Sequence, residues 1–399
     1  WFQDLLLGWG WSQELVTVIS LLIGAAVVAI VSLTTVIVLI WVERKLAARI
    51  QDRLGPNRAG PFGLLQPIAD VIKIFTKEIT TPDGPDIVVF NSAPVLAIAS
   101  VLMIWAVIPF SSTVVGSDLS VGVLYIVAVG SFGVVAILMA GWSSNNKYAL
   151  VGAIRAVAQV VSYEVPMVLS LLVPTLLSGS MGVNSIVQSQ NVWFVIIAPI
   201  AAVIFFISSM AEVGRAPFDL LEAESEIVAG FHNEYSGMAI GWFYVGEFLH
   251  VWTVGALFGK FFFGGWRGPG ADLYPILGIV YFYLKTFLGY FLITWIRLSV
   301  PRIRIDHLLA FKWKFLTPLA LLVLVVTAIL DKILANAGIG LEPGKRMWLY
   351  SLIMLAANGL VGWITTLVMK RFEEKRQRER LTFPTRPVAV APKPSDSGS

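Results

Sequence analysis

The sequence predicts an all-α polytopic membrane protein with about nine transmembrane helices and one cytoplasmic amphipathic helix. Two observations lead to this fold class. Hydrophobic residues make up 57 % of the 399 residues and charged residues only 14 %, whereas soluble domains carry roughly 25 % charged residues. The apolar residues also gather into stretches of about 20 residues or more, the length that an α-helix needs to cross the hydrocarbon core of a bilayer.

Nine stretches are long enough to span a bilayer, and they make residues 1–369 a single transmembrane domain. They are 16–41, 94–115, 121–142, 157–178, 192–211, 237–259, 275–296, 315–335 and 347–369. Pro199 interrupts one of them, which membrane helices tolerate where neighbours satisfy the freed backbone groups. The remaining residues, 370–399, combine a charge run with four prolines, a composition typical of a disordered basic cytoplasmic tail.

The distribution of basic residues predicts the orientation of these spans. The loops on the side reached after the first span carry 23 Lys and Arg residues, and the opposite loops carry 5. Cytoplasmic loops are usually rich in Lys and Arg, so we expect the N-terminus outside the cell and the C-terminus in the cytoplasm. We expect the chain to lie in the inner (plasma) membrane.

The long cytoplasmic loop over 43–90 contains a second kind of helix. Four apolar residues of the stretch 64–76 fall on one helical face: Leu65, Ile68, Ile72 and Phe75. Polar residues occupy the other side, as in amphipathic helices that lie in the membrane interface. The alternative is an ordinary helix packed against the spans.

The segment 212–234 is acidic on a side that is otherwise basic, with a net charge of −5. If 217–230 is helical, Asp219, Glu222 and Glu226 share one face. Acids that share a poorly hydrated site cannot all ionise, and groups that change protonation state near neutral pH can relay protons. The alternative is a solvated acidic loop.

Two further carboxylates, Glu164 and Glu247, lie inside predicted spans, and His250 shares a face with Glu247. A charge within the bilayer costs at least roughly 2.5–3.5 kcal/mol, so such acids usually belong to proton or ion pathways. The alternative is a structural ion pair, for example of Glu164 with Lys285 or Arg155. The basic clusters near the span ends are explained by cytoplasmic anchoring for most of their members.

Several function classes are excluded by composition. The chain has no cysteine and three scattered histidines, so we expect no Cys-ligated iron–sulfur cluster and no bis-histidine haem. Complete phosphate-loop, dinucleotide-binding and HExxH patterns are absent from the sequence. We therefore expect no metal site and no cofactor bound by this chain alone. The slight basic excess indicates membrane topology, and we expect no nucleic-acid partner.

Two long motifs resemble the complex I subunit 1 family, whose bacterial members are called the H subunit. The first runs from Glu43-Arg44-Lys45 through Leu54-Gly55-Pro56-Asn57-Arg58-Ala59-Gly60-Pro61 to Asp70-Val71-Ile72-Lys73. The second is Arg215-Ala216-Pro217-Phe218-Asp219-Leu220-Leu221-Glu222-Ala223-Glu224-Ser225-Glu226. Shorter matches occur at Ser144–Leu150 and Ser162-Tyr163-Glu164, and the resemblance covers about 16–335. The family core has eight spans, so 347–369 is an additional ninth.

The resemblance implies a membrane subunit of proton-translocating NADH-quinone oxidoreductase, which forms part of the quinone chamber and the start of a proton relay. It implies quinone-binding roles for Arg44, Arg49, Asp70, Glu224, Phe231, Arg302 and Arg304. It implies proton-path roles for Glu164, Glu212, Arg215, Asp219, Glu222, Glu224, Glu226 and Glu247. Ile305 and His307 depart from the Tyr and Gln that the family often has, which affects the contacts expected there.

The same resemblance implies that quinone is the substrate and that iron–sulfur clusters and FMN lie in partner subunits. The partners would be the peripheral-arm subunits of the quinone site, including the iron–sulfur subunit nearest the membrane, together with small and antiporter-like membrane subunits. The chain alone would have no enzymatic activity. Two alternatives are the anchor subunit of a related membrane-bound hydrogenase or ferredoxin-linked complex, and a stand-alone ion antiporter.

Overall fold

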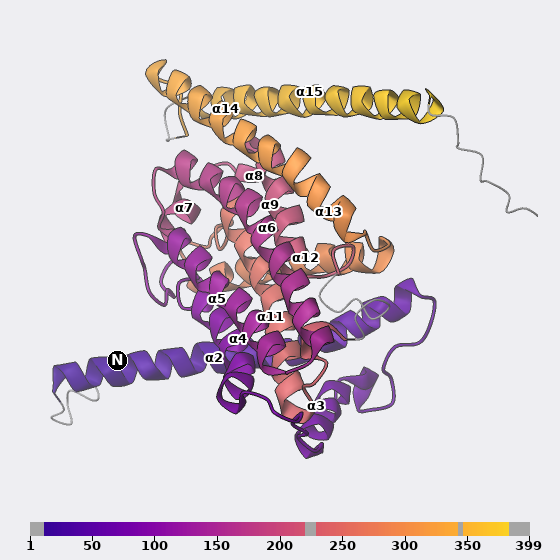
Figure 1. Cartoon of the computed structure of the whole chain (residues 1–399). Coiled ribbons are helices and arrows are strands. Elements are labelled where there is room, and N and C mark those ends of the chain that lie inside the picture. The colour runs from indigo at the N-terminus through magenta and orange to yellow at the C-terminus, as the bar shows by residue number, and fades with distance from the viewer. Residues whose placement is uncertain (1–11, 220–228, 342–345, 383–399) are drawn as a thin grey trace, which may run out of the picture.

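The computed structural model describes residues 12–219, 229–341 and 346–382, with side chains up to residue 371, and all regular elements of this part are helical (Figure 1). The longer helices are α2 (Gln13–Ile50), α4 (Ile87–Trp105), α5 (Gly122–Ser143), α6 (Lys147–Ser178), α9 (Pro199–Val213), α11 (Gly237–Phe262), α12 (Pro275–Ser299), α14 (Thr317–Asn336) and α15 (Met347–Thr382). The shorter elements are η1 (Pro61–Gly63), α3 (Gln66–Thr76), α7 (Val183–Ser189), α8 (Phe194–Ile197), η2 (Gly230–His232), α13 (Ile305–Phe311) and the π-helical η3 (Lys312–Leu316).

The predicted fold class is confirmed: the chain is an all-helical, multi-pass membrane protein. Within the described residues, seven helices are long and apolar enough to cross a membrane, counting α13 to α14 as one, and α9 is a shorter apolar helix. Helix α11 has 26 residues but is less apolar, because Glu247, His250 and Lys260 interrupt it. Each of the nine predicted spans thus overlaps a helix.

Several predicted boundaries were wrong, because an apolar stretch can be a buried non-helical segment as well as a membrane helix. The span expected over 94–115 ends as a helix at Trp105, and the following Val107 and Ile108 are buried in a turn instead. The span expected over 157–178 begins earlier, where the Asn146 side chain accepts a hydrogen bond from the Tyr148 N–H at 2.9 Å. Such a cap satisfies a free donor of the first helical turn.

The tail expected to be disordered from residue 370 is helical up to Thr382 within α15. Glu, Lys, Arg and Gln dominate the sequence of this segment, and these residues have high helix propensity. The first proline of the tail is Pro384, so nothing in the sequence stops the helix before that point.

The interruption at Pro199 divides the predicted fifth span into α8 and α9. Ala198 between them has non-helical backbone angles. The carbonyl of Ile197 accepts a hydrogen bond from the Asn358 side chain of α15 at 3.1 Å. A neighbouring helix therefore satisfies a backbone group at the break, as the physics of a water-free environment requires.

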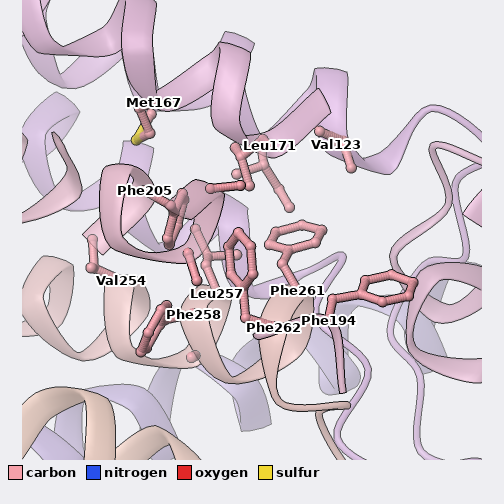
Figure 2. Packing of buried hydrophobic residues seen from close by; sticks show 14 of the residues in the cluster. Val123, Met167, Leu171, Phe194, Phe205, Val254, Leu257, Phe258, Phe261 and Phe262 are labelled. Carbon is pink, nitrogen blue, oxygen red and sulfur yellow. The ribbon is translucent and has the colours of Figure 1, made fainter. Parts of the chain in front are cut away.

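An apolar core surrounds the second half of α11 (Figure 2). Phe258, Phe261 and Phe262 of α11 pack with Phe205 of α9, and the ring centroids of Phe205 and Phe262 lie 5.6 Å apart. Met167 and Leu171 of α6 close the cluster from another side. All residues from Val251 to Phe262 are buried, so this half of α11 is a densely packed support for the half that precedes it.

Helix α3 confirms that the predicted amphipathic stretch is helical, and one side of it contacts α2 and α11. Its apolar face is not packed against the bundle, since Leu65, Ile68, Ile72 and Phe75 are 44–64 % exposed. Leu64 and Leu65 belong to the turn that precedes α3. The exposed apolar face is the arrangement of an interfacial helix.

Helices α11 and α12 approach so closely that their contact depends on glycine. A Cβ at Gly255 would lie 2.8 Å from the Thr286 carbonyl oxygen, and one at Gly289 would lie 2.9 Å from the Gly255 Cα. Small residues at such crossings let backbones of membrane helices meet.

We expect Gly255→Ala to destabilise the chain by about 1–3 kcal/mol, because the added methyl group overpacks a backbone contact. The measurement is the thermal midpoint of the detergent-solubilised protein. Gly24→Ala is the matched control, since a Cβ at Gly24 meets no atom within 4 Å. An unchanged midpoint for Gly255→Ala would show that the two helices are not held at this distance.

Candidate functional site

A cavity of about 120 Å³ lies among α4, α5, α9, α11 and the turn after α9. One water molecule needs roughly 10–15 Å³, so the cavity has room for several. Its lining is apolar on the side of α4 and α5 and ionisable on the other side. The ionisable lining groups are Glu212, Arg215, Asp219, His232, Tyr244, Glu247, His250 and Arg297.

Arg215 is the centre of this site. It is 3 % exposed. Its Nη1 donates a hydrogen bond to Oε1 of Glu43 at 2.8 Å, and its Nε lies 2.7 Å from Oε1 of Glu247. The guanidinium also lies over the Phe248 ring, 4.8 Å from its centroid. A cation buried to this degree needs such partners, because removing it from water costs several kcal/mol.

Glu43 of α2 also connects Arg215 to α12. Its Oε1 also accepts a hydrogen bond from Arg297 of α12, and its Oε2 accepts one from the Tyr290 hydroxyl at 3.2 Å. Glu43 comes from α2 and Glu247 from α11. We call Glu43, Arg215, Glu247 and Arg297 the ion cluster; it joins α2, α11 and α12 to the turn after α9.

The turn that carries Arg215 is shaped by a few local features. Helix α9 ends at Gly214, whose φ of 74° is favourable for glycine. The buried Gln159 side chain donates to the carbonyls of Ala211 and Phe218, both at 2.7 Å. These contacts hold both ends of the turn, so Arg215 is directed into the protein.

The helix predicted over 217–230 is wrong at both described ends. Residues 217–219 form a turn and an irregular segment, and 229–232 form a turn and the short helix η2. Glu222, Glu224 and Glu226 lie outside the described residues. The predicted start of this helix is not helical, because the Phe218 carbonyl accepts a hydrogen bond from the Gln159 side chain of α6. The shared face of Asp219, Glu222 and Glu226 stays a prediction.

A second, smaller cavity continues the site toward Glu164, and Glu212 and His250 line both cavities. The Ser131 hydroxyl donates a hydrogen bond to Oε1 of Glu164 at 2.8 Å. Nε2 of His250 lies 4.0 Å from Oε1 of Glu212. Glu247, Glu212 and Glu164, from three different helices, are thus brought together along one pair of cavities.

The structural ion pairs considered for Glu164 do not form. Lys285 donates instead to the Arg267 carbonyl at 2.7 Å and lies over the Trp193 ring. Arg155 precedes Glu164 on α6 by about two and a half turns, which places the two side chains on opposite faces of the helix. Glu164 is therefore bound through a hydroxyl of α5 rather than neutralised by either cation.

The expected quinone-site residues fall into two groups. Phe231 is buried, packs against Phe243 with 5.4 Å between ring centroids, and lines the larger cavity. Arg44 forms an ion pair with Asp70 that joins α2 to α3. Arg49 and Arg304 are exposed and Arg302 is half-buried; none of the three belongs to the described lining of this cavity.

The sequence analysis gave no site role to Glu43, His232 or Arg297, although all three lie in or beside the site. Burial lowers the pKa of His232 to about 4, so the imidazole is neutral at pH 7. The sequence does contain one indication of a role for Glu43, because this acid lies directly before Arg44-Lys45 at the end of an apolar span. Such an acid near the bilayer needs a cation as partner.

Comparison with known proteins agrees with the sequence motifs. The family model described as NADH dehydrogenase matches residues 23–328. The chain belongs to this family. The match ends within α14, so α15 lies beyond it. This agrees with the interpretation of 347–369 as a helix added to the family core.

Three relatives illustrate the similarity. The H subunit of NADH-quinone oxidoreductase from Dehalococcoides mccartyi (strain CBDB1) is 51 % identical over 296 residues, which cover 74 % of this chain and 82 % of the relative. An H subunit of the same enzyme from Geobacter sulfurreducens is 47 % identical over 76 % of this chain and 93 % of its own length. The H subunit from Brevibacillus brevis is 43 % identical, covering 78 % of this chain and 94 % of its own length.

We expect Arg215→Ala to destabilise the protein by roughly 3–5 kcal/mol, because it leaves Glu43 and Glu247 buried with one cation fewer. The double variant Arg215→Ala/Glu247→Gln should recover part of this loss, since it removes one of the uncompensated charges. The measurement is the thermal midpoint and the yield of the assembled complex.

Arg44→Ala is the control for this prediction. Its ion pair with Asp70 is accessible, with 45 % and 27 % side-chain exposure, and exposed pairs contribute about 0–1 kcal/mol. Equal losses for Arg44→Ala and Arg215→Ala would contradict the central position of the buried pair.

Proposed function

We propose that this chain is the H subunit of a proton-translocating NADH-quinone oxidoreductase, where it forms part of the quinone chamber and the start of the proton relay. Family membership and the names of the relatives support the assignment to this complex. The observation that carries the proton-relay role is the row of partly buried carboxylates Glu247, Glu212 and Glu164 along two cavities that share lining residues.

The ion cluster suits a change of protonation state at Glu247. Glu43 lies between two arginines, which compensate its negative charge. Glu247 pairs with Arg215 and borders the cavity, with 28 % of its side chain accessible. When Glu247 takes up a proton, Arg215 keeps its hydrogen bond to Glu43, and the ion cluster gains one positive charge beside the cavity.

Electron transfer to quinone is assigned to partner subunits. FMN and iron–sulfur clusters would supply that chemistry when present, and this cysteine-free chain offers no thiolate to hold a cluster. The contribution of this chain is to bind quinone, to keep charges paired and to move protons at the carboxyl oxygens of the relay. We propose that the redox-dependent charge in the chamber alters the proton affinity of Glu247 through the ion cluster.

The quinone role rests on different residues. The exposed apolar face of α3 borders the Arg44–Asp70 ion pair, so a long apolar tail could lie along α3 while its polar head meets charged groups. Phe231 is proposed to contact quinone from within the larger cavity. Arg49, Arg302, Arg304 and Glu224 are retained as proposed quinone-site residues, and Glu222 and Glu226 as proposed relay acids.

Two experiments separate this function from the alternatives. Mass spectrometry of the purified complex should find subunits with iron–sulfur clusters and an NADH-binding flavoprotein; hydrogenase subunits would favour the anchor of a hydrogenase. The chain alone in liposomes should move no ions, whereas a stand-alone antiporter would. Orientation, with the N-terminus outside and the C-terminus cytoplasmic, can be tested by protease access from each side.

We expect Leu65→Arg or Ile68→Arg to abolish quinone reduction while the complex still reduces a hydrophilic artificial acceptor. The reason is that a charge on the apolar face of α3 obstructs entry of the apolar quinone tail. Both activities are measured on isolated membranes. Ile68→Leu keeps the face apolar and should retain both. Equal loss of both activities in the Arg variants would indicate misassembly and remove the support for an entry at α3.

We expect Glu164→Gln and Glu247→Gln to assemble normally and to lose proton-coupled turnover. Glutamine preserves the shape and hydrogen bonding of these side chains but cannot titrate. Glu→Asp at either position should retain more activity than Gln. The measurement is proton uptake per quinone reduced in proteoliposomes. Undiminished pumping by a Gln variant would remove that residue from the path.

A further inference from the structure

His250 occupies the junction of the two cavities. It lies on α11 one turn after Glu247, and it lines the larger cavity beside Glu247 and the smaller cavity beside Glu164. A quarter of its side chain is accessible, and its Nε2 lies 4.0 Å from Oε1 of Glu212. A small side-chain movement would bring the two atoms within hydrogen-bond distance, and catalytic hydrogen bonds are often this long before turnover.

The surroundings of His250 direct it toward carboxylates. Further along α11, the Thr253 hydroxyl is already engaged, because it donates to the Leu249 carbonyl and accepts from the Trp105 indole N–H at 2.7 Å. The ionisable groups along the two cavities are Glu212 of α9, Glu164 of α6, Tyr244 and Glu247 of α11, Arg215, Asp219 and His232 of the loop, and Arg297 of α12. Among them, the Glu212 carboxylate faces His250, with 4.0 Å between Oε1 and the imidazole Nε2.

We propose that His250 is a relay residue that passes protons between the Glu247 side and the Glu212–Glu164 side of the site. The inference rests on the proposed proton-path function and adds a non-carboxylate member to that path. It identifies His250 as the residue through which a proton would pass from one cavity to the other.

The transfer balances without any other reactant. A neutral imidazole has one nitrogen that carries a proton and one that accepts a proton. A carboxylic acid on one side gives a proton, directly or through a water molecule, to the accepting nitrogen while the other nitrogen releases its proton to a carboxylate on the opposite side. One carboxyl group loses a proton, another gains one, and the imidazole ends neutral as its other tautomer. Ring rotation or return transfer restores the first tautomer.

The test compares His250→Gln with His250→Glu in the assembled complex. Glutamine preserves hydrogen bonding but carries no proton, whereas glutamate carries one. If His250 relays protons, quinone-coupled proton uptake should fall at least about tenfold in the Gln variant, and the Glu variant should retain more than the Gln variant. A structural histidine gives the reverse order, because Gln is tolerated and a further buried carboxyl group is not.

Two controls make each outcome decisive. His307 is exposed, so His307→Gln makes the same chemical change outside the cavities and should leave proton uptake unchanged. Native gels and the hydrophilic-acceptor activity report assembly. If wild type pumps, Glu247→Gln does not, and His250→Gln pumps at the wild-type ratio, the inference about His250 is overturned while the proposed function stands. If the wild-type complex itself moves no protons, the proposed function fails.

Discussion

The buried Arg215 guanidinium, held between Glu43 and Glu247, is the interaction on which the rest of the site depends. Its two carboxylate partners come from α2 and α11, so these helices must be correctly placed before the cation is compensated. The desolvation penalty of a buried charge makes partial assembly unfavourable. The ion cluster thereby fixes the direction of the turn after α9 and forms the charged wall of the larger cavity.

Helix α11 supports this arrangement by dividing its length between two tasks. The half from Val251 to Phe262 is buried among aromatic and aliphatic side chains (Figure 2), and Gly255 allows α12 to approach closely. The preceding half presents Glu247 and His250 to the cavities. The two side chains that we propose to relay protons therefore extend from a helix anchored in a densely packed core.

The site also shows how a membrane protein can hold charged side chains between its helices. In the ion cluster each charged side chain lies beside one of opposite charge. Arginine and glutamate side chains can therefore lie between the helices with little exposure to solvent. Glu164 is bound by a hydroxyl instead of a cation. Glu43 and Glu164 thus show two ways of binding a carboxylate between helices, one through arginines and one through a hydroxyl.

The sequence by itself determined the membrane fold, the approximate position of each span, the exposed apolar face of α3 and the family. These follow from local properties, because a bilayer demands apolar stretches of helical length and an interfacial helix needs a one-sided period. It also identified Glu164, Glu212, Glu247 and Arg215 as residues of interest. Helix ends at Trp105 and Lys147 were not predicted, since a buried turn is as apolar as a helix and a cap shifts the start.

Only the tertiary structure decided which charges meet. Glu43 and Arg215 are 172 positions apart, and no local period relates them. A Glu164–Lys285 ion pair was an alternative that the sequence left open, yet Lys285 binds the Arg267 carbonyl. The junction at His250 likewise arises from three helices that pack side by side. Pairing of buried charges depends on contacts between distant segments, and hydropathy and spacing contain no information on these contacts.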